Sequence, residues 1–151
     1  MNIARATTED AAAWLELRLA LWPGERREEF VAEISHLLAD PGDTVTFIVR
    51  DDAGEPAGFV EAALRHDYVN GCETSPVAFL EGIYTTPARR RQGIARLMVD
   101  AVADWGRQQG CTEFASDAST ENVVSQQMHA HLGFTETQRV VCFRKTLRGE
   151  Q

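Results

Sequence analysis

The most distinctive pattern in the chain is an apolar, strand-like run that is followed by a short basic loop and an amphipathic helix. The run spans 79–84, and the loop carries Arg89, Arg90 and Arg91 before Gly93. Beyond the loop, apolar residues recur at i, i+3, i+4, i+7, i+8 and i+11, namely Ile94, Leu97, Met98, Ala101, Val102 and Trp105. Because this spacing gathers them on one face of a helix, the segment predicts a strand, a loop and a helix that closes at Gly110.

The start of this helix has the properties of an anion site. The first amides of a helix lack partners within it and lie at the positive end of its dipole. Gly93 lets the backbone approach a ligand closely, and the arginines add positive charge at the same place. The anion that we expect here is a phosphate. The alternative is a solvated basic loop that only caps an ordinary helix.

Two helices and a hairpin are expected before this unit. Thr7 followed by Asp10 is typical of a capping box, and β-branched and aromatic residues dominate the hairpin. The expected elements are an edge strand over 1–6, helices over 7–22 and 25–39, hairpin strands over 44–50 and 56–64, and a polar loop over 65–76.

A second strand and helix are expected after it. Ser119 is the expected N-cap of the helix and Gly133 its C-cap. The elements are a strand over 113–116, a helix over 121–132 and a last strand over 139–147. The complete order is β-α-α-β-β-β-α-β-α-β, which predicts one mixed α/β domain over 1–151.

Composition narrows the classes of function. The net charge of −8 argues against nucleic acid as a partner. An acidic surface attracts a cationic substrate, although solubility alone also favours such a charge. No apolar run approaches the ~20 residues of a membrane span, and no signal-peptide pattern opens the chain. The three cysteines are widely spaced, so we expect free thiols in the cytoplasm, no disulfide frame and no metal site.

The order of the elements, the Arg90-x-x-Gly93-x-Ala95 spacing and the closing Leu132-Gly133-Phe134 together resemble the GNAT superfamily of N-acetyltransferases. The resemblance implies a mixed, mostly antiparallel sheet with splayed central strands, flanked by helices. It also implies acetyl-CoA as co-substrate, with its pantetheine arm in the gap and its pyrophosphate at the helix start. The implied contacts are Ile83, Tyr84, Thr85, Arg90, Arg91, Gln92, Gly93, Ile94, Ala95, Arg96 and Asn122. Asn122 could instead serve only as a helix cap.

Four further segments, 21–24, 65–72, 80–83 and 115–117, narrow the resemblance to the chromosomal-type aminoglycoside 6′-N-acetyltransferases. It implies drug contacts from carboxylates, which suit ammonium groups, and from aromatic faces, which suit sugar rings and cations. Trp22 is one of the implied aromatic contacts, and the alternative is that it is a residue of the core. Two positions depart from the family pattern and are expected to alter the substrate range: Glu25 replaces a frequent histidine, and Gln138 replaces an acidic contact. The implied substrate contacts are Trp22, Glu25, Tyr68, Glu81, Asp117 and Gln138.

Glu81 and Asp117 are the candidate catalytic residues. Glu81 interrupts an apolar strand, where a carboxylate needs an explanation. Either it faces a substrate cleft and binds or deprotonates an ammonium, or it forms a structural ion pair, with Arg65 as a candidate partner. Asp117 ends the next strand, at the edge where ligands gather in open α/β sheets, and its alternative is a helix cap. Gly82 either marks a bulge that opens the gap or allows close packing.

His129 lies four residues before Gly133. By the resemblance, many GNAT enzymes carry at this position a tyrosine that protonates the departing thiolate. A histidine can perform this step. A surface or core histidine is the alternative.

Together these features predict acetyl-CoA-dependent acetylation of the 6′-amine of aminoglycosides by direct attack, since no cysteine stands where an activated nucleophile is expected. The alternatives are a GNAT enzyme for polyamines or protein amino groups and a non-catalytic acyl-CoA-binding domain. A homodimer is also expected. The run 140–143 is too apolar for a safe edge strand, and relatives pair or exchange this region between subunits.

Overall fold

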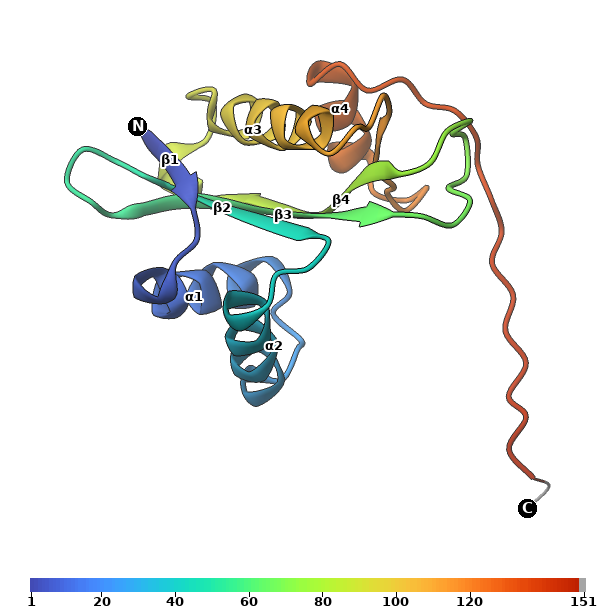
Figure 1. Ribbon diagram of the computed structural model, residues 1–151, viewed down its shortest axis with the longest axis horizontal. Helices are drawn as coiled ribbons and strands as arrows, with labels where there is room; N and C mark the ends of the chain where they lie inside the picture. Colours follow the sequence, from blue (N-terminus) through green and yellow to red (C-terminus); the bar gives the residue numbers. More distant parts are fainter. Residues whose placement is uncertain (150–151) are drawn as a thin grey trace.

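The computed structural model describes residues 1–149 as a sheet with helices on both faces (Figure 1). The strand order is β1-β2-β3-β4-β5, with β4 and β5 parallel and the other pairs antiparallel. The expected mixed, mostly antiparallel sheet is therefore confirmed, with β1 at one edge. The strands and helices are β1 (Asn2–Arg5), α1 (Ala11–Leu21), α2 (Arg27–Ala39), β2 (Thr44–Arg50), β3 (Pro56–Arg65), β4 (Val77–Thr85), α3 (Ile94–Gln108), β5 (Phe114–Ala115) and α4 (Val123–His131).

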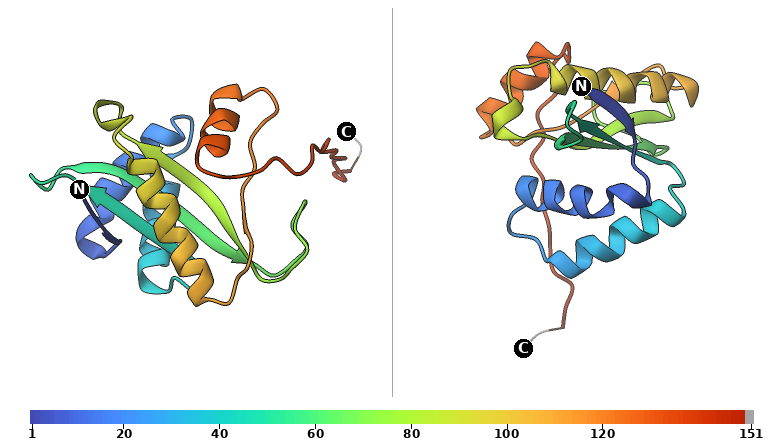
Figure 2. Two further views of the ribbon diagram at one scale, coloured as in Figure 1. Left: turned by 90° about the horizontal axis from the view of Figure 1, so that it is seen from above. Right: turned by 90° about the vertical axis from the view of Figure 1, so that its left-hand side faces the viewer.

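The helices form two layers, one on each face of the sheet. Helices α1 and α2 lie on one face, and α3 and α4 lie on the other, as the side view in Figure 2 also shows. The apolar stripe predicted for α3 is confirmed, because it packs against the sheet through buried Ile94, Met98, Val102 and Trp105. A second buried cluster joins α1 and α2 to the opposite face through Trp14, Phe30, Ile48 and Phe59. The sheet is thus a partition between two apolar cores.

One extra residue in β4 changes which side chains face which core. Glu61 of β3 pairs with Gly82, and the next residue, Ala62, pairs with Leu80, so Glu81 has no partner in the register. This is a β-bulge. Before it, Leu80 packs into the core under α3. Because side chains alternate along a strand, the extra residue moves Ile83 rather than Gly82 to that face.

Strands β4 and β5 separate soon after they meet. Only two residue pairs join them, Ala78 with Phe114 and Phe79 with Ala115. Beyond Phe79, β4 continues to Thr85 alongside β3 alone. This divergence is the splay that the resemblance implies. It leaves the end of β4 with an edge that no strand of the described chain covers.

Several predicted boundaries require correction. The capping box of Thr7 and Asp10 is present, although it opens a short 3-10 helix, Thr8–Asp10, ahead of α1. The predicted strand over 113–116 is shorter than expected. The N-cap of α4 is Asn122, whose side-chain oxygen accepts a hydrogen bond from the amide of Ser125 at 3.0 Å. Ser119 is therefore not the cap. Its hydroxyl accepts from the amide of Glu121 in the preceding turn.

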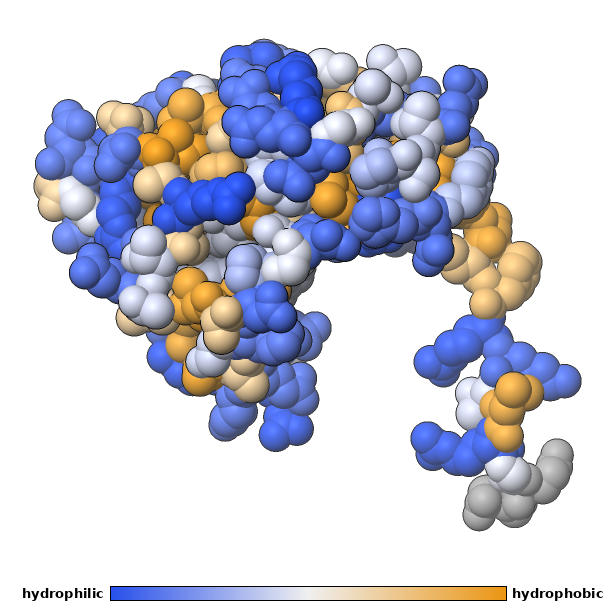
Figure 3. All heavy atoms as spheres, viewed as in Figure 1, coloured by the Kyte–Doolittle hydropathy of each residue, from blue (hydrophilic) through white to orange (hydrophobic). Residues whose placement is uncertain are grey.

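The prediction of a last strand over 139–147 is wrong. The described residues after α4 form an extended tail that leads away from the body of the molecule (Figure 1). A strand needs a neighbour with which to exchange backbone hydrogen bonds, and the described part of the chain places none beside this tail. Its apolar side chains consequently face outward, as Figure 3 shows along the tail. Val141 is 78% exposed and Phe143 is 92% exposed.

Candidate functional site

The loop before α3 has the backbone that an anion site requires. Gly93 is the N-cap of α3 and has a left-handed conformation, with φ of 79°. Arg91 also has a positive φ, 65°, which is uncommon for a residue with a side chain. A Cβ atom on Gly93 would meet no atom within 4 Å, so the space in front of the helix start is open. The amides of Ile94, Ala95 and Arg96 have no acceptor within the helix and lie next to this space.

The arginines of this region have different partners. Arg89 is held by Asp51 of the β2–β3 turn, with 2.6 Å between Nη2 and Oδ2. The pKa of Asp51 is held below its usual value, chiefly because its carboxylate accepts a hydrogen bond from the amide of Glu55. Arg90 donates from Nε to the carbonyl oxygen of Thr85. Arg89 is thus neutralised, and Arg90 remains over the end of β4.

The other predicted cofactor contacts divide between backbone and side chain. The side chain of Ile94 is buried in the core, so only its amide is available to a ligand. Arg96 donates from Nη2 to the carbonyl oxygen of His131 at 2.7 Å, which ties α3 to the end of α4. Asn122 caps α4, as its alternative interpretation proposed. Ile83, Tyr84, Thr85 and Ala95 are partly buried, whereas Arg90, Arg91 and Gln92 are exposed.

Glu81 forms the ion pair with Arg65 that was one of its two alternatives, and it also stays exposed. Its Oε1 accepts hydrogen bonds from Arg65, at 2.9 Å from Nη2 and 3.3 Å from Nε. The Arg65 guanidinium lies 3.8 Å from the centroid of the Phe79 ring. The Glu81 side chain nevertheless remains 36% exposed at the bulge. It is therefore an oriented carboxylate that solvent, and hence a cation, can reach.

Trp22 lies against the backbone next to this carboxylate. A Cβ atom on Gly82 would stand 2.6 Å from Cη2 and 2.8 Å from Cζ2 of Trp22, so no larger residue fits. The indole also meets the rings of Phe30 and Phe59 edge-on, at centroid distances of 5.9 and 6.2 Å. Gly82 thus serves both proposed purposes, since it adjoins the bulge and admits a close contact. Trp22 is partly buried and packs against the α1–α2 core, so it is neither a fully buried core residue nor a fully exposed one.

A buried ion pair under Trp22 was not anticipated from the sequence. Arg18 and Glu61 are joined at 2.6 Å between Nε and Oε2 and at 3.0 Å between Nη2 and Oε1. Trp14 donates from Nε1 to the same Glu61 Oε2. Burial alone would lower the pKa of Arg18, but the hydrogen bond and charge of Glu61, followed by those of Glu33, raise it. The signal was that Arg18 and Glu61 each stand inside a largely apolar run, 14–19 and 57–64, of which the first also holds Glu16.

His129 is fixed by both of its ring nitrogens. Nδ1 lies 2.7 Å from the carbonyl oxygen of Ser125, and Nε2 lies 2.7 Å from Oγ of Ser116. A carbonyl can only accept, so Nδ1 carries a proton, and in the neutral ring Nε2 accepts from the serine hydroxyl. Asp117 follows Ser116 and is exposed. The structure thus brings β5 and α4 together at a serine–histidine contact.

The remaining substrate candidates lie at the surface. Tyr68 is 76% exposed, and Glu25 and Gln138 are exposed. Within residues 1–149, no side-chain hydrogen bond or ion pair joins these three residues to Trp22, Glu81 or Asp117. The structure therefore places Trp22 against the backbone beside the Glu81 bulge. Glu25 is joined to Trp22 through the backbone alone, since its amide donates to the Trp22 carbonyl oxygen at 3.2 Å.

The loop that carries Tyr68 is anchored at its far end. Glu113 accepts hydrogen bonds from the amides of Glu73 and Thr74 and from the Thr74 hydroxyl. The hydroxyl contact is the main reason why the pKa of Glu113 lies below its usual value. A Cβ atom on Gly71 would overlap Thr137, so the loop also packs against the root of the tail. The anchored loop leaves Tyr68 projecting into solvent.

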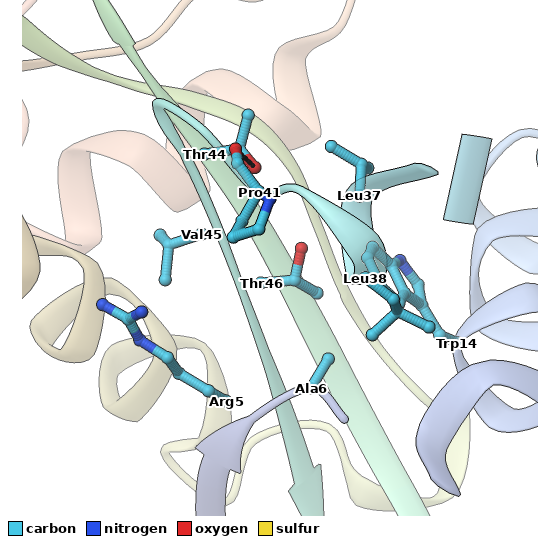
Figure 4. A pocket seen from close by; sticks show the side chains of 9 residues that line it. All are labelled: Arg5, Ala6, Trp14, Leu37, Leu38, Pro41, Thr44, Val45 and Thr46. Carbon is cyan, nitrogen blue, oxygen red and sulfur yellow. Dashed lines mark hydrogen bonds between the residues drawn. The ribbon is translucent and has the colours of Figure 1, made fainter. Parts of the chain in front are cut away.

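The hollow shown in Figure 4 is separate from these residues. It measures about 120 Å³ and lies between the start of β2, the end of α2 and α1. Its lining is mostly apolar, with Trp14, Leu37, Leu38 and Val45 among its residues. None of the predicted catalytic or binding residues contributes to it. Over the described residues, no cluster of three or more His, Cys, Asp or Glu side chains is placed to hold a metal ion.

Comparisons with known proteins agree on one family. Residues 11–134 match the acetyltransferase (GNAT) family. A protein of Serratia marcescens named aminoglycoside N(6′)-acetyltransferase type 1 is 55% identical over 135 residues, which cover 89% of this chain and 92% of that protein. A protein of the same name from Stenotrophomonas maltophilia is 47% identical over 146 residues, which cover 97% of this chain and 94% of that protein.

Solved structures give the same result. AAC(6′)-Iy in complex with the bisubstrate analog CoA-S-monomethyl-acetylneamine matches with a TM-score of 0.91 and 43% identity, over 96% of this chain and 97% of that chain. The apo aminoglycoside 6′-N-acetyltransferase AAC(6′)-IG from Acinetobacter haemolyticus matches with a TM-score of 0.92 and 43% identity, over 98% of this chain and all of that chain. The match thus extends over the splayed sheet and the helix start at Gly93, and the chain belongs to the acetyltransferase (GNAT) family.

Proposed function

We propose that this protein transfers the acetyl group of acetyl-CoA to the 6′-amine of aminoglycosides. The observation that carries the proposal is the oriented, solvent-reachable carboxylate of Glu81, which lies at the point where β4 parts from β5 and beside the indole of Trp22. A carboxylate next to an aromatic face suits an ammonium group carried on a sugar ring. The related AAC(6′)-Iy, at 43% identity, forms a complex with a bisubstrate analog of CoA and a neamine derivative.

The residues around α3 suit the co-substrate acetyl-CoA. The left-handed backbone at Arg91 and Gly93 and the open space in front of Gly93 fit a pyrophosphate that approaches the helix start. Arg90, Arg91, Gln92 and Arg96 would supply positive charge and donors around it. The uncovered edge of β4 at Ile83, Tyr84 and Thr85 would pair with the amide groups of the pantetheine arm.

The amine must lose a proton before it can attack. Primary amines are largely protonated at neutral pH, so a base is required. Glu81 or Asp117 would accept this proton, directly or through a water molecule. The amine lone pair then forms the new C–N bond as the C–S bond of the thioester breaks. The sulfur leaves as a thiolate and takes up a proton, for which His129 carrying a proton on both ring nitrogens is a candidate donor, with Nε2 donating to Ser116 and the Ser116 hydroxyl donating to the sulfur.

The cysteines support direct attack without an acetylated enzyme. Burial raises the pKa of both the Cys72 and the Cys111 thiols, which disfavours the reactive thiolate. Glu113 adds to this effect at Cys72. Neither thiol therefore has the electropositive surroundings of a nucleophilic cysteine.

Two other amine classes and one non-catalytic role compete with this proposal. Polyamines carry ammonium groups but no sugar rings, so the exposed ring of Tyr68 and the partly buried indole of Trp22 favour aminoglycosides over them. Protein amino groups need an open groove for an extended backbone, and the anchored loop at 66–76 is expected to obstruct one. An acyl-CoA-binding domain without catalysis would have no need of an oriented carboxylate at the bulge.

The tail supports a homodimer as the second part of the proposal. The apolar side chains of Val141 and Phe143 are exposed on a segment that no part of the described chain covers. Strand β5 ends the sheet, so its outer edge is open to an added strand. If two copies exchanged their tails, the apolar side chains of each tail would be buried against the partner. The open edge of β5 would also gain a paired strand.

The cytoplasm is the expected location of the protein, since acetyl-CoA is available there. Among the described residues, none of the helices combines the length and the apolarity that crossing a membrane would take. The three cysteines are free thiols, in accord with a reducing compartment.

The proposed chemistry predicts that Glu81→Gln and Asp117→Asn each lower kcat/KM for kanamycin. The loss of transition-state stabilisation should be about 1–3 kcal/mol, the scale of a lost charged hydrogen bond. Thiol release from acetyl-CoA measures this. Asp104→Asn, which removes a carboxylate from an exposed ion pair at the far end of α3, is the matched control and should retain wild-type rates. Arg65→Met should reduce the rate less than Glu81→Gln, because Arg65 only orients the carboxylate.

The same assay tests the regiochemistry. An aminoglycoside with a 6′-amine should be acetylated, and an otherwise similar drug with a 6′-hydroxyl should not. Equal rates on the two drugs would refute the 6′ assignment. No reaction with either drug, but a reaction with spermidine or peptides, would establish one of the rival substrates.

The anion site predicts that Gly93→Asp weakens acetyl-CoA binding about tenfold or more, because a negative side chain would stand where the pyrophosphate approaches. Calorimetry with acetyl-CoA measures the loss. Gly110→Asp is the matched control, since Gly110 also has a positive φ and open space around its Cβ position but lies at the other end of α3. The two variants share the backbone strain, so equal affinities for acetyl-CoA would contradict the site.

The dimer predicts a mass of two chains in light scattering at micromolar concentration. Val141→Lys combined with Phe143→Lys should give the mass of one chain, because two charges cannot be buried against a partner. Val31→Lys, at an exposed apolar position of α2, should leave the mass unchanged. A monomeric wild-type protein would overturn the proposal, and so would a doubly substituted protein that remains a dimer.

A further inference from the structure

Arg18 and Glu61 form a charged pair in the interior of the α1–α2 core. Arg18 is 5% exposed and Glu61 is 8% exposed, and they are the buried charged residues of the described chain. Their geometry is bidentate, and Trp14 donates to the same carboxylate. Burying two charges is costly, and apolar residues of similar size often serve stability equally well. The pair therefore calls for a role beyond holding the fold together.

The flat guanidinium of Arg18 is surrounded by aromatic rings. Its central carbon lies 5.7 Å from the ring centroid of Trp14, 5.9 Å from that of Trp22 and 5.0 Å from that of Phe30. Cations at such distances attract ring faces, more strongly where water is excluded. Of these rings, Trp22 is the one that lies against Gly82, the neighbour of Glu81.

Trp22 is held between this cation and the backbone of β4. On its other side it lies so close to Gly82 that a Cβ atom there would stand 2.6 Å from the indole. Glu61, which holds Arg18, is paired with Gly82 across β3 and β4, next to the bulge at Glu81. One chain of contacts thus runs from Glu61 through Arg18 and Trp22 back to the residue beside Glu81.

We infer that Arg18, held by Glu61, is a positioning residue that fixes the Trp22 indole beside the Glu81 carboxylate and thereby sets the affinity for the amine substrate. The inference rests on the proposed aminoglycoside acetylation. Arg18 is 5% exposed and is therefore not expected to contact either substrate. It acts by keeping one wall of the amine site in place before the drug arrives, so that binding does not have to order it.

A double-mutant cycle tests whether Arg18 acts through Trp22. Removing Arg18 alone would strand a buried carboxylate, so the pair is neutralised together as Arg18→Met with Glu61→Gln, which keeps an acceptor for Trp14. In the wild-type background this change should raise KM for kanamycin about fivefold, the scale of one cation–ring contact, with KM for acetyl-CoA changed by less than about twofold. In the Trp22→Ala background the same change should alter KM for kanamycin by less than about twofold.

Controls separate positioning from folding. Glu33→Gln removes the other, more exposed partner of Arg18 but keeps the pair and the rings, and should leave both KM values unchanged. If the neutral pair does not fold, Arg18→Lys replaces it in the cycle, since it keeps the charge but loses the flat guanidinium. An equal rise in KM with and without Trp22, or no rise in either, would overturn the inference.

A spectroscopic measurement makes the inference independent of activity. The indole N–H resonance of Trp22, assigned by its loss in Trp22→Phe, should be a single sharp signal in the wild-type protein and should broaden or split in the neutral pair. An unchanged signal would contradict the inference. If the wild-type protein acetylated no aminoglycoside, the proposed function would fail, and this resonance alone would decide the role of Arg18.

Discussion

The structure depends on one extra residue in β4. Glu81 has no partner in the β3 register, so the side chains that follow it exchange faces. In the same stretch β5 ends its pairing with β4, after Phe79. The strand therefore leaves the bulge with one free edge, which suits an amide-containing arm, and with Glu81 directed outward. The two halves of the proposed site, for the acetyl donor and for the amine, therefore meet where the bulge and the end of the β4–β5 pairing coincide.

The proposed amine side is built from the core outward. The Arg18–Glu61 pair lies beneath Trp22, Trp22 lies against Gly82, and Gly82 is the neighbour of the exposed carboxylate. The buried pair restricts Trp22, and Trp22 restricts the backbone at Gly82. The exposed Glu81 thus takes its position from buried residues. The donor side is built differently, from backbone conformation at Gly93 and Arg91 and from the amides of α3. A phosphate can be recognised there without any deep cavity.

The sequence was sufficient for most of the fold because period and turn chemistry act locally. The stripe of α3, the hairpin of β2 and β3 and the capping box at Thr7 all follow from residues within a few positions of one another. The strand over 139–147 failed because its β-rich pattern needs a partner that the described chain does not place beside it. The cap of α4 was misplaced by three residues because Ser119 and Asn122 are both good caps, and only the geometry of the turn selects between them.

The sequence indicated which residues belong to the candidate site, but not which contacts join them. Glu81, Trp22 and Gly93 stand out in the sequence as a carboxylate in a strand, an aromatic residue at a helix end and a glycine after arginines. That Arg65 orients Glu81 was one of two alternatives, and the structure shows it together with the exposure that the other alternative required. Contacts between residues far apart in the chain, such as Arg18 with Glu61 and Ser116 with His129, depend on tertiary packing that no local pattern encodes.

We propose that the donor and the amine occupy the two sides of the bulge in β4. Amide and indole chemical shifts under titration test it most directly. Adding CoA should shift the amides of 83–85 and 93–96, and adding kanamycin afterwards should shift Gly82 and the indole N–H of Trp22. Shifts confined to the hollow between α1, α2 and β2, with β4 and the start of α3 unchanged, would contradict this arrangement.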